Sequence, residues 1–252
     1  MASTDGDGHH KGSGSDNRIL DALPEQDLDR LSAQLTPVDH AVTTVLSEPG
    51  SEIDSVYFPL DGVVSLVTPL AEGAVVEVAT IGNEGIVGVP LALSRGIATV
   101  RAVSQVSGRS LRMPTSLFIT EVQRGGALGA LVQSYVAALF TQVAQASGCN
   151  RLHSNEQRLS RWLLMSHDRV GRDDFPITQV FLAQMLGSRR ATVTLSAGVL
   201  QGRGLIRYRR GQLTIVNREG LERAACSCYR IIKDELDSVV GRALRPLEPH
   251  AH

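Results

Sequence analysis

The sequence lacks several features that would place it in a large protein class. It has three cysteines in 252 residues, Cys149, Cys226 and Cys228, too few for a disulfide-stabilised scaffold. No uninterrupted apolar run approaches the roughly 20 residues that cross a bilayer. Residues 1–17 are polar and rich in Gly and Ser, without the apolar centre of a signal peptide. We therefore predict a cytoplasmic protein that does not enter a membrane, with residues 1–17 as a disordered tail.

Motifs of common enzyme chemistry are also missing. The sequence has no Ser/His/Asp order with nucleophile-elbow glycines, no phosphate loop ending in Gly-Lys-Ser and no HExxH. The acidic pair Asp173-Asp174 stands beside Pro176 and is typical of a linker. The sequence therefore predicts a protein that is not an enzyme.

The cysteines do not follow a familiar metal-binding spacing. Cys226 and Cys228 form Cys-x-Cys, a poor fit to the Cys-x-x-Cys of metal knuckles. We expect three buried free thiols, ordinary packing or surface roles for His153 and His167, and no metal or other cofactor. A thiol or metal site formed by Cys149, His153, Cys226 and Cys228 is the alternative.

The most informative segment present is Ile177–Val216. Thr178 can cap a first short helix, and Gly187 can end it because Gly adopts left-handed backbone angles. Ser188 is expected to cap the second helix, after which the runs LIRYRR and QLTIV form two short strands around a basic tip. This order predicts a winged helix-turn-helix, which places its second helix in the DNA major groove.

The second helix is predicted to have one buried and one exposed face. Val193, Ala197 and Leu200 recur at helical spacing on the inner face. Arg pairs two-point with guanine, and Ala or Thr contacts thymine methyls. The outward positions are Ala191, Thr194, Leu195 and Gly198. The predicted DNA contacts are Thr178, Gln179, Ser188, Arg189, Arg190, Ala191, Thr192, Thr194, Leu195, Arg207, Arg209 and Arg210.

Charge is distributed unevenly, although the whole chain carries only −1. Residues 1–150 carry −8, residues 151–216 carry +7, and residues 217–252 carry 0. Phosphate backbones favour such a basic region because binding releases condensed counterions. The charge pattern therefore independently indicates a nucleic-acid partner.

The preceding half contains helices, then strands, then a long helix. Residues 19–35 show a helical stripe of Leu28, Leu31 and Leu35, and short β-rich runs follow from Val42, which predict an antiparallel sandwich or roll. The loop 82–90 is rich in Gly, so its backbone can approach a ligand. No proline interrupts residues 115–175, which include the predicted long helix. The apolar stripe of this helix is Val132, Val136, Leu139, Phe140 and Val143.

That stripe allows two interpretations. A long apolar-striped helix between a sheet domain and a DNA-binding domain favours a homodimer seam, and symmetric operators favour dimeric readers. The alternative is a helix packed onto its own sheet. Residues 217–252 add a predicted helix from Arg218 to Leu244, packed on the winged domain or on a partner subunit. Its stripe is Leu221, Ala225, Tyr229, Ile232 and Leu236.

In this order, the elements resemble those of the CRP/FNR superfamily of bacterial transcription regulators. The resemblance rests on Glu48-Pro49-Gly50, VYFPLDGVVSLV, GNEGIVGVP, the long helix and the winged helix-turn-helix. It implies an α+β fold with an N-terminal antiparallel, cyclic-nucleotide-binding-like β-roll, a long dimerisation helix and a C-terminal winged helix-turn-helix. The implied domains are a β-roll sensor (18–122), a dimerisation helix (123–148), a DNA-binding domain (149–217) and a C-terminal helix and tail (218–252).

The resemblance weakens at the effector loop. Members that bind cyclic nucleotides have Glu where this chain has Ile86, and Arg before a Ser or Thr where it has Gly96-Ile97. Without that Arg, a buried phosphate would lose a charge-assisted pair, so we expect weak or absent binding of cyclic AMP. The candidate pocket residues are Glu77, Gly85, Ile86, Val87, Gly88, Val89, Ala98 and Thr99.

The recognition helix also departs from the family, because Ala191 and Leu195 occupy positions where Glu and Arg are common. The operator should therefore differ from the familiar one. The function predicted is a sequence-specific dimeric transcription regulator that binds double-stranded DNA, with RNA polymerase and an unidentified small-molecule effector as further partners. The alternative is a regulatory protein that senses another nucleotide or a redox signal and acts through protein contacts.

Overall fold

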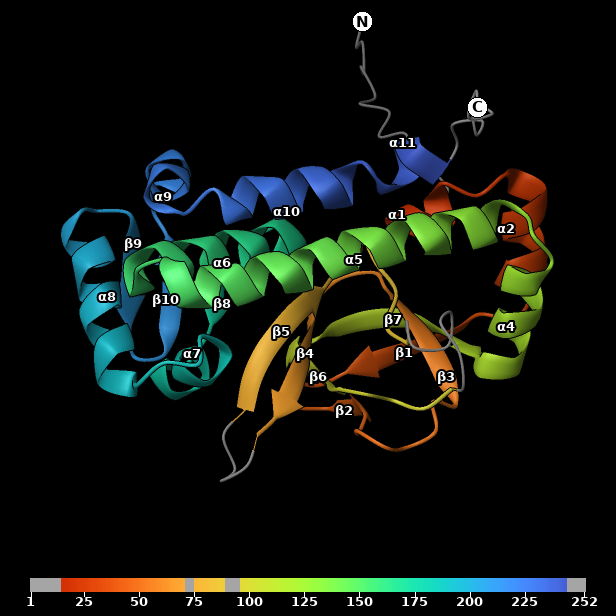
Figure 1. The fold of residues 1–252 in the computed structure, drawn as a ribbon, viewed down its shortest axis with the longest axis horizontal. Helices are drawn as coiled ribbons and strands as arrows, with labels where there is room; N and C mark the ends of the chain where they lie inside the picture. The colour runs from red at the N-terminus through yellow and green to blue at the C-terminus, as the bar shows by residue number, and fades with distance from the viewer. Residues whose placement is uncertain (1–14, 71–74, 89–95, 244–252) are drawn as a thin grey trace, which may run out of the picture.

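A computed structural model describes residues 15–70, 75–88 and 96–243. Figure 1 shows a long central helix, α5 (Ala127–Leu152), lying lengthwise across the molecule. The strands of a β-roll lie on one side of α5 and two C-terminal helices on the other, while a small helical domain lies at one end. The predicted α+β architecture is confirmed.

The β-roll consists of two antiparallel sheets. In the first, β7 lies between β1 and β3, and in the second the order is β2-β6-β4-β5. Turns at Asp, Gly and Pro separate the strands, as the sequence predicts. The strands are β1 (Thr36–His40), β2 (Val45–Ser47), β3 (Ser55–Pro59), β4 (Val63–Pro69), β5 (Val75–Ile81), β6 (Arg101–Val106) and β7 (Gly108–Pro114).

Helices close the roll at both ends of its sequence: α1 (Arg18–Asp21), α2 (Glu25–Ser32) and α4 (Thr115–Gln123). Asn17, assigned to the tail from the sequence, is instead fully buried. Its side chain caps α1 and donates to the carbonyls of Pro59 and Gly85. The predicted tail is therefore wrong for Asn17, because an amide can satisfy several buried backbone groups at once; residues 1–14 lie outside the described part.

The long helix begins four residues later than the predicted 123–148 and ends at Leu152. Among the described residues, α5 is the one helix long and apolar enough to cross a membrane. Of its most apolar window, 44% is buried inside the chain. Its stripe divides between two surroundings. Val132 and Leu139 are buried within the chain, whereas Phe140 and Val143 are exposed. One face of the helix is therefore packed within its own chain, as the alternative interpretation predicts, whereas the face that carries Phe140 stays exposed.

The helical domain at the end of α5 begins after a two-residue connection. It contains α6 (Asn155–Val170), β8 (Asp174–Pro176), α7 (Gln179–Met185), α8 (Arg190–Gly202), β9 (Ile206–Arg209) and β10 (Gln212–Ile215). The segment predicted as a linker around Asp174 is instead a strand, since β8 pairs with β10 in a three-stranded sheet. A strand of three residues is too short for sequence periodicity to detect.

The C-terminal segment is three helices rather than the predicted single one: α9 (Arg218–Ala224), α10 (Cys228–Asp237) and α11 (Val239–Ala243). The chain is extended at Ala225, where the first helix ends. α9 packs on α6, whereas α10 and α11 pack on α5. Helix α5 of the same chain is thus the main packing partner of α10 and α11. The sequence predicted packing on the winged domain or on a partner subunit, and neither alternative included α5.

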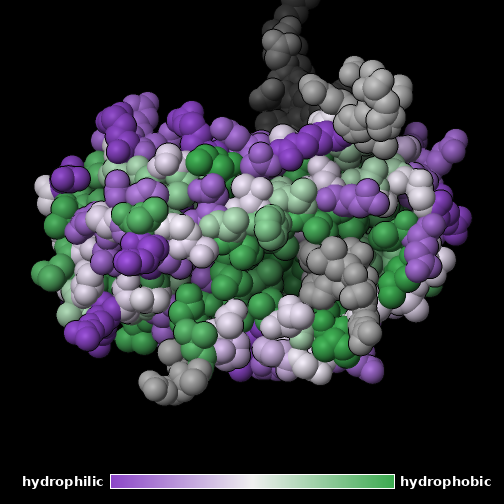
Figure 2. Space-filling view, viewed as in Figure 1, coloured by the Kyte–Doolittle hydropathy of each residue, from purple (hydrophilic) through white to green (hydrophobic). Residues whose placement is uncertain are grey.

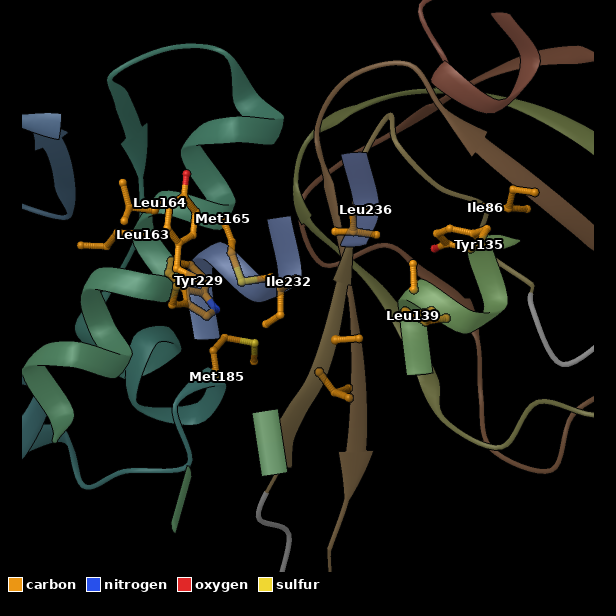
Figure 3. Close-up of a cluster of buried hydrophobic side chains, with 14 of the residues drawn as sticks. Ile86, Tyr135, Leu139, Leu163, Leu164, Met165, Met185, Tyr229, Ile232 and Leu236 are labelled. Carbon is orange, nitrogen blue, oxygen red and sulfur yellow. The ribbon is translucent and has the colours of Figure 1, made fainter. Parts of the chain in front are cut away.

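One hydrophobic core runs through all these parts. Figure 3 shows Ile86 and Tyr135 at the roll end of this core, and Leu163 and Leu164 at its helical end. Between them, Ile232 and Leu236 of α10 bridge the two regions. The roll, α5 and the helical domain are therefore packed against one another rather than joined only by a linker.

Candidate nucleic-acid interface and sensor domain

The turn between α7 and α8 is built as the sequence predicts at its start and differently at its end. Thr178 caps α7 by accepting from the Phe181 N–H. Gly187 has φ +54°, and the N–H groups of Gly187 and Ser188 bond back to Gln184 and Ala183, the Schellman ending of a helix.

Ser188, however, does not cap α8. The N-cap of α8 is Arg189, whose side chain makes no capping bond. The Ser188 hydroxyl donates instead to Asn155 Oδ1 at 2.7 Å. Arg158 donates to the carbonyl of Leu186. The first turn of α6 thus holds the turn that precedes the recognition helix.

The exposed face of α8 matches the prediction. Val193, Ala197 and Leu200 are buried, while Ala191 and Leu195 point to solvent, Leu195 with 71% of its surface exposed. None of the predicted DNA contacts is buried, and Gln179, Ser188 and Thr192 are partly exposed. The Thr194 hydroxyl donates to Gln179 Oε1 at 2.8 Å, which joins the exposed face of α8 to the start of α7.

The wing is a tight hairpin beside this helix. Arg209 pairs with Gln212, so Arg210 and Gly211 form a two-residue turn in which both have positive φ, the arrangement of a type I′ turn. Tyr208 ties the wing to the helices, because its N–H donates to Gln201 Oε1 and its hydroxyl donates to the Ile177 carbonyl. The basic tip is therefore fixed relative to α8.

The basic charge of this domain divides into buried and exposed sets. Arg158, Arg161 and Arg169 are buried and contribute to packing rather than to a binding surface. The five arginines predicted to contact DNA are all exposed, and none forms an ion pair with the described residues. They are Arg189, Arg190, Arg207, Arg209 and Arg210.

The described part of the roll leaves only a small cavity at the predicted effector loop. This cavity of about 20 Å³ is lined by the β2-β6-β4-β5 sheet and adjoining loops, and it has space for about one water molecule. Of the predicted pocket residues, Val87, Gly88 and Ala98 line it. The described lining is otherwise apolar except for one serine: Ser47, Ile53, Leu66, Ile81, Val100 and Ala102.

The remaining predicted pocket residues lie elsewhere. Ile86 is buried in the main core, and a Cβ on Gly85 would lie 2.4 Å from Tyr135 Oη. Thr99 is exposed, and Val89 lies outside the described residues. Arg101, at the start of β6, pairs with Glu48 at 2.9 Å.

Glu77 faces the helical domain rather than the cavity. Its Oε1 accepts from Trp162 Nε1 at 2.8 Å, and its Oε2 lies 2.7 Å from Ser65 Oγ. Burial raises the pKa of Glu77 to about 7. Ser65 Oγ also lies 2.6 Å from Gln105 Oε1; since one hydroxyl has a single proton, a protonated Glu77 that donates to Ser65 satisfies all three groups.

A buried ion pair makes a second connection between the roll and α6. Arg169 Nη2 lies 2.7 Å from Glu84 Oε1 in the glycine-rich loop, and the two side chains are 4% and 7% exposed. Arg169 also donates to the carbonyls of Thr80 and Met165. The described part of the loop predicted to approach a ligand, residues 82–88, thus contacts α5 and α6.

A more open cavity of about 190 Å³ lies between this loop, α6 and α10. Sequence reasoning did not identify it, because its walls come from four distant segments, α1 included. Charged and apolar groups line it: Arg18, Asn83, Glu84, Met165, Asp168, Arg169, Tyr229, Ile232, Lys233, Leu236 and Asp237.

The structure also brings together the four residues of the alternative thiol or metal site. Cys149, His153, Cys226 and Cys228 place their sulfur and nitrogen atoms within 4.8 Å of one another. His167 is separate from them and lies 2.7 Å from Asp173.

Comparisons with known proteins agree with this architecture. Residues 157–224 match the model of the Crp-like helix-turn-helix domain. No match was found among curated protein sequences.

Solved structures share the fold over most of the chain. A protein from Eubacterium rectale, assigned to the crp/fnr family of transcriptional regulators, has 17% identity and a TM-score of 0.66, covering 84% of this chain and 99% of its own. FixK2 from Bradyrhizobium japonicum has 13% identity and a TM-score of 0.63, covering 77% and 98%.

A third, the c-di-GMP responsive global regulator CLP of Xanthomonas campestris, has 14% identity and a TM-score of 0.62, covering 76% and 99%. The matched structures are described as regulators rather than enzymes. The chain therefore contains a Crp-like helix-turn-helix domain within a fold that it shares with these regulators, as its sequence predicts.

Proposed function

We propose that this chain is a sequence-specific, dimeric DNA-binding transcription regulator that acts in the cytoplasm. The observation that carries the proposal is the set of five exposed arginines without ion-pair partners among the described residues, two at the start of α8 and three on the wing. Surface arginines that pair with neighbouring carboxylates gain little from a phosphate, whereas unpaired ones are available to it. The predicted α8 contacts would then lie against base edges.

A homodimer is supported by the outer face of α5. This face carries apolar side chains at helical spacing that the chain itself does not cover: Ala137, Phe140, Val143 and Ala144. Figure 2 shows hydrophobic surface over the middle of the molecule, where α5 crosses the view. Phe140, with 74% of its surface exposed, is the natural centre of a seam between two copies.

The β-roll is proposed to act without cyclic AMP. A cyclic nucleotide needs far more space than the small apolar cavity in the described part of the roll, and it needs a cation for its phosphate. No arginine or lysine is among the described residues that line the cavity. The roll then serves as a scaffold or responds to a different effector, and RNA polymerase is a further proposed partner.

A second candidate function is a helix-turn-helix that contacts protein. The exposed apolar residues Leu195, Val180 and Val199 on the surface of this domain favour it. Salt dependence separates the two functions, because binding to phosphates weakens steeply with salt and apolar protein contacts do not.

The test uses the full chain and labelled DNA duplexes over a series of salt concentrations. We expect log K to fall linearly with log salt, with a slope of about −0.9 for each phosphate neutralised, and selection from a random duplex library to yield a symmetric site. Absence of duplex binding even at low salt would contradict the proposed function.

A further inference from the structure

The four residues brought together at the end of α5 come from three separate segments. Cys149 lies in the last turn of α5, and His153 lies in the connection to α6. Cys226 lies between α9 and α10, and Cys228 is the first residue of α10. The cysteines are the only three of the whole sequence, and all are free and buried. They form a cluster of their own, apart from the main hydrophobic core.

Two of their six separations are close to the edges of a tetrahedron around a metal ion. Cys149 Sγ and Cys226 Sγ are 3.5 Å apart, and Cys228 Sγ and His153 Nδ1 are 3.7 Å apart. Zinc–sulfur bonds of about 2.3 Å and zinc–nitrogen bonds of about 2.0 Å give tetrahedral edges of about 3.8 Å and about 3.5 Å. These two distances agree with such a site to within a few tenths of an ångström, and all four ligand atoms lie within 4.8 Å of one another.

The donor set identifies the class of ion. Three thiolates and one imidazole are soft or borderline ligands, which suit zinc and do not suit magnesium or calcium. Bound to three thiolates, a divalent ion gives a centre with a net charge of −1.

A buried guanidinium lies beside this cluster. Arg161 is 7% exposed, and its Nε has no hydrogen-bond partner among the described residues. The positive charge of Arg161 acts on Cys149. An anionic metal–thiolate centre would compensate a buried cation that is otherwise unfavourable.

We propose that Cys149, His153, Cys226 and Cys228 bind one zinc ion per chain through three thiolates and Nδ1 of the imidazole. As the three Zn–S bonds form, any S–H protons still present pass to solvent, and no oxidant or reductant is required. The sequence-based expectation of no metal rested on the Cys-x-Cys spacing of Cys226 and Cys228, and a thiol or metal site of all four residues was its alternative. The other two ligands, Cys149 and His153, lie more than 70 residues before Cys226 in the sequence.

The site lies where it can fix the joint between α5 and the DNA-binding domain. His153 occupies the connection between α5 and α6, and the first turn of α6 holds the α7–α8 turn through Asn155 and Arg158. Zinc would also attach the start of α10 to the end of α5. It would thereby set the position of the recognition helix, a consequence that rests on the proposed function.

The primary experiment measures metal directly. The full chain, purified in the presence of a thiol reductant and dialysed against a weak chelator, is expected to retain about one zinc per chain by elemental mass spectrometry. Cobalt substitution is expected to give a thiolate-to-cobalt charge-transfer band and intense visible bands of tetrahedral cobalt.

The variants separate ligation from folding. Cys228→Ser is expected to lose most of the zinc and about a third of the charge-transfer intensity of any cobalt it retains. His153→Cys is expected to keep one zinc, because it supplies a fourth thiolate. His167→Asn, which removes a histidine outside the cluster, serves as the matched control and should keep the metal. Circular dichroism checks that each variant is folded.

Three outcomes would overturn the site. The first is a folded, reduced chain that neither retains zinc nor gives the cobalt–thiolate band. The second is a disulfide in the native chain. The third is full zinc retention by the Cys149→Ser, Cys226→Ser, Cys228→Ser triple variant. Duplex binding is measured separately, and zinc removal is expected to weaken it by roughly fivefold or more. If the chain bound zinc but did not bind DNA, the proposed function would be contradicted and the metal site would still be supported.

Discussion

The helix-turn-helix and its wing keep five arginines exposed, whereas the β-roll packs apolar side chains into its interior. These five arginines lack ion-pair partners among the described residues. In the β-roll, Ile86 is buried in the core, and the cavity lined by the β2-β6-β4-β5 sheet measures about 20 Å³. A group of unpaired like charges repels itself until a partner of opposite charge binds, so the comparison indicates that binding chemistry is concentrated in one region.

The two regions are nevertheless mechanically connected. Glu77 and Glu84 of the roll hold Trp162 and Arg169 of α6. Because α6 also supports the α7–α8 turn, a change in the roll could reach the recognition helix through packed contacts. The following predictions test how different the two regions are, and how firmly they are joined.

The largest expected effect is on DNA affinity. Arg189→Ala combined with Arg190→Ala should weaken operator binding at least about 100-fold, since each base or phosphate contact is worth about 1–3 kcal/mol. Fluorescence anisotropy with a labelled duplex measures it, and the dimer should remain intact by sedimentation.

The matched control is Arg124→Ala with Arg223→Ala, two exposed arginines outside the interface. It removes the same charge and should change affinity by only a few-fold. Wild-type affinity in the Arg189/Arg190 variant would show that the recognition helix is misplaced.

The next effect concerns the seam between subunits. Phe140→Glu places a charge at the most exposed apolar position on the middle of α5 and should raise the dimer dissociation constant by about 100-fold or more, because a buried unpaired carboxylate is strongly unfavourable. Analytical ultracentrifugation over a concentration series provides the measurement. Leu152→Glu, at the exposed end of α5, should have the smaller effect; equal effects would argue against a seam centred on Phe140.

Packing of the glycine-rich loop gives an intermediate effect. In Gly85→Ala the added Cβ would meet the ring of buried Tyr135, so the free energy of unfolding should fall by about 1–3 kcal/mol. Gly198→Ala has open space at its Cβ position and should stabilise α8 by up to about 1 kcal/mol. Chemical denaturation measures both, and a fully stable Gly85→Ala chain would show that the loop is open rather than filled.

The contact between the roll and α6 predicts a pH dependence. Because the pKa of Glu77 is raised to about 7, the folded chain binds a proton more tightly than the unfolded chain. The stability from this group is full below about pH 4.5 and is lost as pH rises through 7. Glu77→Gln, which mimics the protonated form, should be more stable than wild type above pH 7 by roughly 1–2 kcal/mol. Melting temperatures between pH 5 and 8 test this, and parallel profiles for the two chains would refute it.

The smallest expected effect is the absence of a response to cyclic AMP. A ligand that binds the folded chain raises its melting temperature by mass action, and millimolar cyclic AMP should produce no measurable rise. A clear rise would break the comparison between the two regions, because the roll would then possess a working pocket.

Much of the fold follows from local sequence patterns. Thr178, Gly187 and the Val193–Ala197–Leu200 stripe define the helix-turn-helix, because capping, left-handed backbone and helical period are properties of neighbouring residues. Ser188 departs from its predicted capping role because its hydroxyl bonds to Asn155, which is 33 residues earlier. A local rule cannot weigh a distant partner against a capping bond.

The sequence alone determined the class of the molecule: a β-rich half, a long apolar helix and a basic winged helix-turn-helix, in that order. Only the tertiary structure decided which face of α5 stays exposed, that Glu77 faces Trp162, and that three cysteines meet one histidine. The physical reason is range. Periodicity, capping and charge act between residues close in the chain, whereas a metal-binding cluster depends on where the ends of separate helices finally pack.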